Sequence, residues 1–250
     1  VLGHIIECGP QCTGGNYTDW RDVQDFAHIG FPVVEAYEDG SFIVTKHDGT
    51  GGLINVESVT SQLLYELGDP ARYLSPDCVA DFTTIQMEQD GPNRVRVHGV
   101  KGLPATDSFK VSMSYANGYK ILATLCIGGP DSIEKAHIVS DMVFSRMKML
   151  GADIPAEDRF LELFGSNVLY KGIVESPDQP HEILMRLGAK GMDASKLNVM
   201  SSEIAPVLTS GPPCITGFAA GRSRASEVVG YWPALIGKDK IKTTVKVEEV

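Results

Sequence analysis

The sequence predicts an α/β protein in which a parallel-sheet part, residues 1–105, precedes an α+β two-layer sandwich, residues 106–250. Three observations carry this prediction. Near the amino end, strand candidates run into glycine-rich loops that lead to helices, as in a parallel α/β sheet. Farther along, segments that alternate apolar and polar residues are joined by turn residues, as in antiparallel hairpins. Helical stripes follow, so we expect helices on one face of a second sheet.

The first part starts with a predicted buried strand at 2–7, which ends in a glycine-rich loop at 8–17. The segment 18–30 predicts a helix, because Thr18 and Asp22 form a pattern like a capping box. Two strands, a second glycine-rich loop and a helix with a clear apolar stripe follow at 32–37, 41–46, 47–52 and 55–67.

The chain after residue 80 is expected to contain two hairpins, three helices and further strands. Asn117-Gly118 predicts a turn between strands 109–115 and 119–127, because this dipeptide tolerates the positive φ of a type I′ turn. The other predicted elements are a hairpin of strands 83–89 and 94–100, a helix at 131–150, a short helix at 156–164, a strand at 182–188, a helix at 194–205 that ends near Pro206, and a closing strand at 227–236.

Charge restricts the partners of this chain. The 22 basic and 32 acidic side chains give a net charge of −10, which argues against binding to nucleic acid or to an anionic membrane surface. The acidic excess lies in residues 1–90, which form either a solvated acidic face, or a carboxylate-rich cleft or docking face for a basic segment. No apolar run approaches the roughly 18 residues of a membrane-spanning helix.

Cysteine and histidine spacing indicates reduced thiols and no metal site. The five cysteines are odd in number and widely scattered, which is typical of an intracellular, cytoplasmic protein. Cys8 and Cys12 have no second close pair, and the six histidines show no ligand spacing.

The first candidate site is the loop that follows the predicted strand at 2–7. Glu7 would lie at the carboxyl end of that strand, where desolvation can raise its pKa and suit it to general acid–base catalysis. Alternatively, N–H groups of the loop stabilise its charge, and Glu7 is a structural anchor for residues 8–17. Cys8 is either a nucleophile or an inert buried thiol. Gly14, Gly15 and Asn16 would present backbone N–H groups to an anion.

The second candidate site is the loop at 47–52. Gly49, Thr50, Gly51 and Gly52 could cradle a phosphate or carboxylate, with Lys46 and His47 supplying charge or a proton. Alternatively the glycines serve only tight packing. If the strands are parallel, both loops lie at one sheet edge, and we expect Glu7 and Gly51 to line one cleft.

The third candidate site is the glycine-rich segment at 210–222. Its terminal Arg222 could bind an anionic substrate group. The alternative is a plain connection to the closing strand.

At these loops the sequence resembles the acyclic terpene utilisation family AtuA. The matching stretches include GHIIECGPQCTGGNYTDW at 3–20, DGSFIVTKHDGTGGLINVESVTSQLLYELGDPARY at 39–73 and TSGPPCITGFAAGR at 209–222. The resemblance implies that residues 1–105 complete a Rossmann-like sheet begun upstream. It also implies a role in the degradation of branched acyclic terpenoids, whose intermediates are coenzyme A thioesters. It supplies no reaction and no catalytic residues.

We therefore expect an intracellular catabolic enzyme that acts on a small acidic or acyl-thioester substrate, with the cofactor undetermined. A nicotinamide enzyme is disfavoured because the dinucleotide fingerprint is missing. The alternative is a non-catalytic binding or assembly subunit. The expected partners are a small-molecule substrate, such as a coenzyme A ester, and another chain or segment that completes the domain, including a homo-oligomer.

Overall fold

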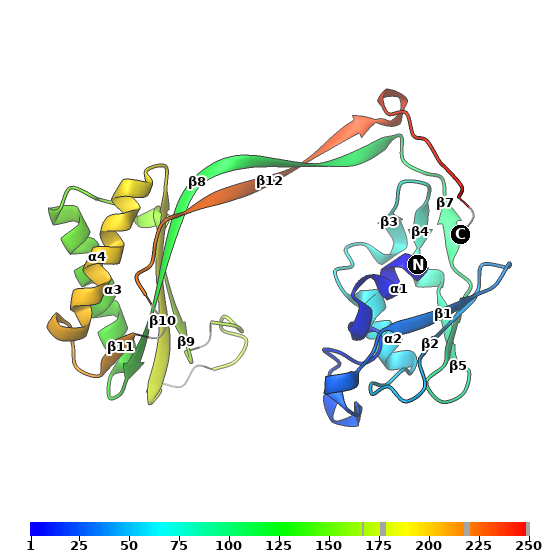
Figure 1. Cartoon of the computed structure of the whole chain (residues 1–250), viewed down its shortest axis with the longest axis horizontal. Coiled ribbons are helices and arrows are strands. Elements are labelled where there is room, and N and C mark those ends of the chain that lie inside the picture. Colours follow the sequence, from blue (N-terminus) through cyan, green and yellow to red (C-terminus); the bar gives the residue numbers. More distant parts are fainter. Residues whose placement is uncertain (167, 176–178, 218–220, 249–250) are drawn as a thin grey trace. The chain divides into compact units, whose positions relative to one another are not determined.

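A computed structural model describes residues 1–166, 168–175, 179–217 and 221–248 (Figure 1). The chain divides into two compact units. The amino-terminal unit consists of Val1–Lys110 and Leu235–Val250, and the central unit is Val111–Ala234. The predicted division at residue 105, with a sheet begun upstream, stays a prediction.

The amino-terminal unit contains short helices and two small sheets. Its α-helices are α1 (Leu2–Glu7) and α2 (Val56–Leu64), and its single 3-10 turns are η1 (Gly9–Gln11), η2 (Trp20–Asp22), η3 (Phe26–His28), η4 (Pro70–Arg72), η5 (Phe82–Thr84) and η7 (Lys238–Lys240). Its strands are β1 (Pro32–Ala36), β2 (Phe42–Lys46), β3 (Tyr73–Leu74), β4 (Val79–Asp81), β5 (Gln86–Gln89), β6 (Val95–His98) and β7 (Lys101–Leu103).

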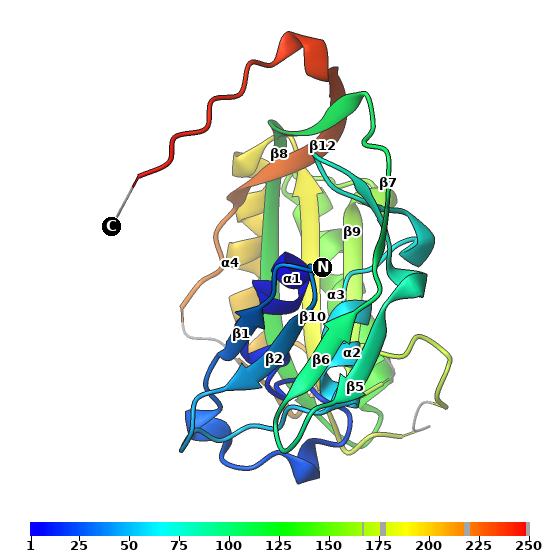
Figure 2. The same ribbon diagram turned by 90° about the vertical axis from the view of Figure 1, so that its right-hand side faces the viewer.

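The sheets of this unit correct the predicted parallel arrangement. One sheet has the order β1-β2-β6-β5 (Figure 2) and the other has the order β3-β4-β7. Within the described residues every one of these pairs is antiparallel. The short connections explain this result, because a parallel pair needs a crossover of about a dozen residues or more. Only residues 37–41 join β1 to β2, and only 90–94 join β5 to β6. The broader α/β class, a mixture of helices and sheets, is confirmed.

The predicted strand at 2–7 is helix α1. The N–H of Ile5 donates to the carbonyl oxygen of Val1 at 3.0 Å, which is an α-helical bond. A short apolar run fits a strand or a helix equally well, so packing decides. Here Nε2 of His4 donates to the carbonyl oxygen of Leu63 (3.1 Å), and the Gln62 amide donates to that of His4 (2.9 Å). These two bonds fix α1 against α2.

The helix predicted at 18–30 is also wrong. It is replaced by the turns η2 and η3, because Val23 is extended and Asp25 has a left-handed φ of 47°. The helix predicted at 55–67 is confirmed as α2. Its Asn55 side chain accepts from the N–H of Ser58, and the Ser58 hydroxyl oxygen accepts from that of Asn55, which completes a capping box.

One apolar core holds the amino-terminal unit together. It joins α1, α2 and both sheets through side chains whose exposure is below a tenth, with Ile5 and Val59 fully buried. Its buried members are Ile5, Cys12, Phe42, Val44, Ile54, Val59, Leu63, Ala80, Phe82, Val95 and Val97.

The central unit is a two-layer α+β structure. Its sheet has the order β11-β8-β10-β9, and β12 also pairs with β8. Helices α3 and α4 cover one face of this sheet (Figure 1). The elements are β8 (Ser108–Gly128), which begins in the amino-terminal unit, α3 (Ser132–Met149), η6 (Ala156–Asp158), β9 (Arg159–Phe164), β10 (Glu182–Gly191), α4 (Ala194–Ser210), β11 (Ile215–Gly217) and β12 (Ser226–Gly237).

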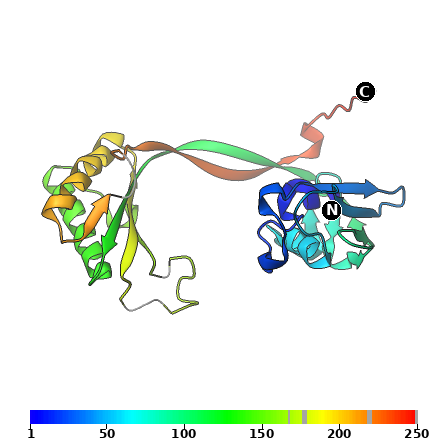
Figure 3. The ribbon, with the colours of Figure 1, turned by 60° about the horizontal axis from the view of Figure 1, so that its bottom comes forward.

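The predicted hairpin at Asn117-Gly118 is instead one continuous strand, β8, of 21 residues. Gly118 has the expected positive φ of 73°, but the chain does not reverse there. The strand continues because it gains a new partner: β10 ends opposite Tyr119, and β12 runs beside β8 (Figure 3). A Cβ at Gly118 would lie 2.7 Å from the carbonyl oxygen of Gly191, so glycine is required for this close approach.

Two predictions in the central unit also fail. The short helix expected at 156–164 is the turn η6 followed by β9, because Arg159–Phe164 pairs with β10. Helix α4 does not end near Pro206 but continues to Ser210. Proline removes one backbone donor, yet the next turn still packs through the fully buried Val207. Among the described residues, no helix is long and apolar enough to span a membrane.

Candidate functional site

Glu7, the proposed proton-transfer residue, ends helix α1 and is exposed. Its Oε2 lies 3.7 Å from Nδ1 of His4, which is buried. Cys8 is half-buried next to it. Tyr65 is a neighbour that the sequence did not suggest: the charges of Glu66, then of Cys8 and Glu7, raise the pKa of its hydroxyl. The catalytic roles of Glu7 and Cys8 stay predictions.

A buried polar pair lies behind Glu7. His4 donates through Nε2 and packs edge-on against the rings of Tyr73 and Phe82, at centroid distances of 5.3 and 5.7 Å. Within the described part of the chain, Nδ1 of His4 and Oε1 of Gln62 are buried without a hydrogen-bond partner. Sequence reasoning missed this pair, because the two residues lie 58 positions apart and each interrupts an apolar run.

Polar groups of the second loop form hydrogen bonds with other groups of the amino-terminal unit. Nζ of Lys46 donates to the carbonyl oxygen of Thr50 (2.7 Å), and the Thr50 hydroxyl donates to that of His47 (2.7 Å). The N–H groups of Gly51 and Gly52 donate to His28 and Gln24 carbonyl oxygens, at 2.8 and 2.7 Å. These two amides are therefore occupied. The side chain of His47 is exposed, and Gly49 has a left-handed φ of 73°.

The structure brings the two glycine-rich loops together. The N–H of Leu53 donates to the carbonyl oxygen of Thr13 (2.9 Å), whose hydroxyl donates to that of Gly30 (3.0 Å). The amides of Gly14 and Gly15 donate within the first loop, to Gln11 and Pro10. Asn16 is exposed, with a φ of 57°. That Glu7 and Gly51 line a single cleft stays a prediction.

Cys12 differs sharply from the other thiols. It is fully buried, and desolvation raises its pKa to about 12. At about pH 8 only about one Cys12 in ten thousand is then a thiolate, the reactive form. We expect iodoacetamide to alkylate the exposed Cys214 of the native chain and to leave Cys12 unmodified, as read from the masses of the two cysteine peptides. Equal labelling of both would contradict the burial of Cys12.

Arg222 lines a cavity of about 210 Å³ in the central unit, between β8 and α4. Among the described residues, Arg222 has no carboxylate partner. The cavity combines this cation and several hydroxyl groups with apolar walls. Its lining residues are Leu122, Ala123, Thr124, Leu125, Ser201, Ile204, Ala205, Leu208, Gly217, Gly221, Arg222 and Ser223.

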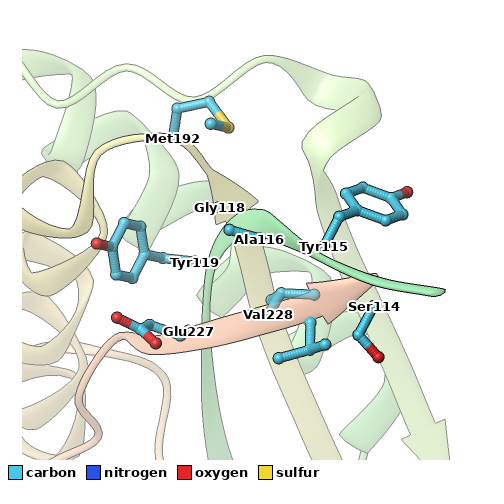
Figure 4. Close-up of a pocket in the computed structure, with 9 residues that line it drawn as sticks. Ser114, Tyr115, Ala116, Gly118, Tyr119, Met192, Glu227 and Val228 are labelled. Atoms are coloured by element: carbon cyan, nitrogen blue, oxygen red, sulfur yellow. The ribbon is translucent and has the colours of Figure 1, made fainter. Parts of the chain in front are cut away.

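A second, more open pocket of about 520 Å³ lies where β8 and β12 run together (Figure 4). It is lined by Ser114, Tyr115, Ala116, Gly118, Tyr119, Met192, Glu227, Val228 and Val229. Glu227 is the single charged residue in this set, so this pocket offers no cation to an acidic ligand. The Arg222 cavity does.

The model of the acyclic terpene utilisation family protein AtuA matches residues 1–247. The chain belongs to the AtuA family. Membership associates it with acyclic terpene utilisation. No curated protein and no solved structure matches the chain.

In this AtuA chain, the described residues contain no group of three or more His, Cys, Asp or Glu side chains that could hold a metal ion.

The sequence alone does not show which apolar residues form the walls of the Arg222 cavity. Leu122 and Ile204 belong to ordinary strand and helix patterns, and only the fold makes them neighbours of Arg222.

Proposed function

We propose that the chain acts in the breakdown of acyclic terpenoids by binding a small branched carboxylate, or the acyl group of its thioester, in the Arg222 cavity. The observation that supports this proposal is that Arg222, which has no carboxylate partner among the described residues, lines a cavity with largely apolar walls. A guanidinium is always charged and can hold a carboxylate through two parallel hydrogen bonds. The hydroxyls of Thr124, Ser201 and Ser223 would add further donors.

The size of the cavity limits the ligand. A volume of about 210 Å³ equals roughly seven times the share of one water in the liquid. That space suits a carboxylate with a short branched chain, which Leu125, Ile204 and Leu208 would surround. The nucleotide part of a coenzyme A ester would remain outside.

We propose further that the protein is a cytoplasmic catabolic enzyme. Glu7, beside the imidazole of His4, is the candidate proton-transfer group, and His47 is the exposed alternative. All five cysteines are free, which supports a reducing compartment.

The alternative function, a non-catalytic binding or assembly subunit, is favoured by one specific observation. The amides of Gly51 and Gly52 are occupied by backbone carbonyl oxygens, so these glycines serve loop packing as the structure stands.

The decisive experiment measures binding of 3-methylbut-2-enoate, a branched five-carbon acid, by calorimetry. Loss of one charge-assisted hydrogen-bond partner costs about 1.5–3 kcal/mol, so Arg222→Gln should weaken binding by about ten- to a hundredfold. Arg224→Gln, which changes a nearby exposed arginine that does not line the cavity, should bind like the wild type. Equal affinities of the Arg222→Gln variant and the wild type, or no binding by the wild type, would overturn the proposal.

A further inference from the structure

In the central unit, residues 111–118 of β8 pair with residues 226–234 of β12 and form a two-stranded ribbon. Among the described residues, this stretch of β8 has no sheet neighbour other than β12, since β10 ends opposite Tyr119. A ribbon of two strands alone is at best marginally stable in water. The ribbon therefore depends on additional packing.

Side-chain contacts define the two faces of this ribbon. A Cβ at Gly230 would lie 2.4 Å from the Tyr115 ring, so these residues share one face. The hydroxyls of Ser112 and Tyr231 meet at 3.3 Å on the other. Because side chains alternate along a strand, the first face carries five apolar side chains larger than alanine, here called the apolar ribbon face. They are Val111, Met113, Tyr115, Val228 and Trp232.

This face is exposed and uncharged. The exposed fractions are 43% for Met113, 47% for Tyr115 and 62% for Trp232. Together these three side chains leave on the order of 400 Å² open, within the range of the largest apolar patches on monomers, which are often functional. Aromatic and methionine side chains, with charges depleted, are typical of the core of a protein–protein interface.

Charge indicates which partner fits. The acidic excess of the chain lies in residues 1–90, whereas the central unit, residues 111–234, carries 13 acidic and 11 basic side chains, so two central units repel each other only weakly. In a dimer with a two-fold axis, a patch on one copy packs against the same patch on the other copy, so charged side chains in that patch would meet like charges. A patch without charged side chains avoids this repulsion. The ribbon contains one charged residue, Glu227, and it lies on the opposite face. A basic partner would instead be attracted by the acidic residues 1–90.

We propose that the apolar ribbon face is a dimer interface, on which a second copy of this chain packs the same face about a two-fold axis. Tyr115 and Trp232 are its central side chains. The exposed area of the three large side chains is about half of the roughly 800 Å² that each partner buries in a standard interface, so we expect a dissociation constant in the micromolar range.

The test compares two Met→Lys variants by analytical ultracentrifugation of the full chain. The wild type should sediment with twice the 27.0 kDa mass of the chain at high concentration. Met113→Lys places like charges at the interface and should weaken the dimer by roughly thirtyfold or more, the effect of losing a hot-spot side chain. Met149→Lys, at an 82% exposed position on α3, should leave the dimer unchanged.

A second measurement does not depend on an interface substitution. The chain has two tryptophans, so a Trp20→Phe variant leaves Trp232 as the sole reporter. Its emission should shift to shorter wavelength as concentration rises through the dissociation constant. A wild type that stays monomeric up to about 100 μM, more than tenfold above the expected constant, would overturn the proposal. So would a dimer that Met113→Lys leaves intact, or a Trp232 emission that does not change with concentration.

Discussion

Replacing Gly51 by alanine is expected to destabilise the amino-terminal unit by about 3 kcal/mol, near the upper end for overpacking. A Cβ at this position would lie 2.3 Å from the carbonyl oxygen of Asp25 and 2.6 Å from that of Gln24. Both neighbours are backbone atoms, so no side-chain rotation relieves the clash. The loops must separate, which breaks the bonds from Gly51 to His28 and from Gly52 to Gln24.

Gly49 in the same loop is the matched control. A Cβ there meets no atom within 4 Å, and only its left-handed φ opposes alanine. Gly49→Ala should therefore cost about 1 kcal/mol. Urea unfolding followed by Trp20 fluorescence, in a Trp232→Phe background, reports on the amino-terminal unit. If Gly51→Ala and Gly49→Ala had the same free energy of unfolding, the loops would separate at no cost in free energy, and the prediction for Gly51 would be wrong.

The same variants test the predicted anion cradle. A ligand that binds only the folded chain raises the unfolding midpoint. Phosphate that stabilises the wild type but not Gly51→Ala would support an anion site at residues 49–52. No effect of phosphate on either protein would support the packing role that the occupied amides indicate.

Local patterns were predicted well where one segment determines its own structure. The apolar stripe of α2 and the hairpin of β5 and β6 depend on periodicity and turn residues, and both are present. Failures occurred where a distant partner decides. The run at 2–7 became a helix because of Gln62 and Leu63, and the chain does not reverse at Asn117-Gly118 because β12 pairs with β8.

The same contrast between local and distant partners applies to the candidate site residues. Lys46, His47 and Thr50 interact within one loop, so their proximity follows from the sequence. The contact of Leu53 with Thr13 joins loops that are 40 residues apart, and the walls around Arg222 come from three separate elements. No periodicity encodes those neighbours, because tertiary packing alone brings them together.

Breaking the ion pair between α3 and α4 is expected to cause the other large loss of stability. Glu203 on α4 is only 6% exposed, and among the described residues its cationic partner is Arg146 of α3. The two side chains are joined by a hydrogen bond from Nε of Arg146 to Oε2 of Glu203. Removing the cation leaves a buried carboxylate without compensation, so Arg146→Met should destabilise the central unit by about 3 kcal/mol.

Two further variants separate this effect from lost packing. Replacing the pair together, as Arg146→Met with Glu203→Leu, removes both charges and should restore most of the stability, because apolar residues of similar size often replace a buried ion pair without loss. Lys148→Met removes the cation of the exposed Lys148–Asp153 pair and should cost less than about 0.5 kcal/mol. Urea unfolding followed by the helical circular dichroism signal is suitable, because α3 and α4, of 18 and 17 residues, are the longest helices described. If the double variant were as unstable as Arg146→Met alone, the loss would come from the arginine's packing and not from an uncompensated charge at Glu203.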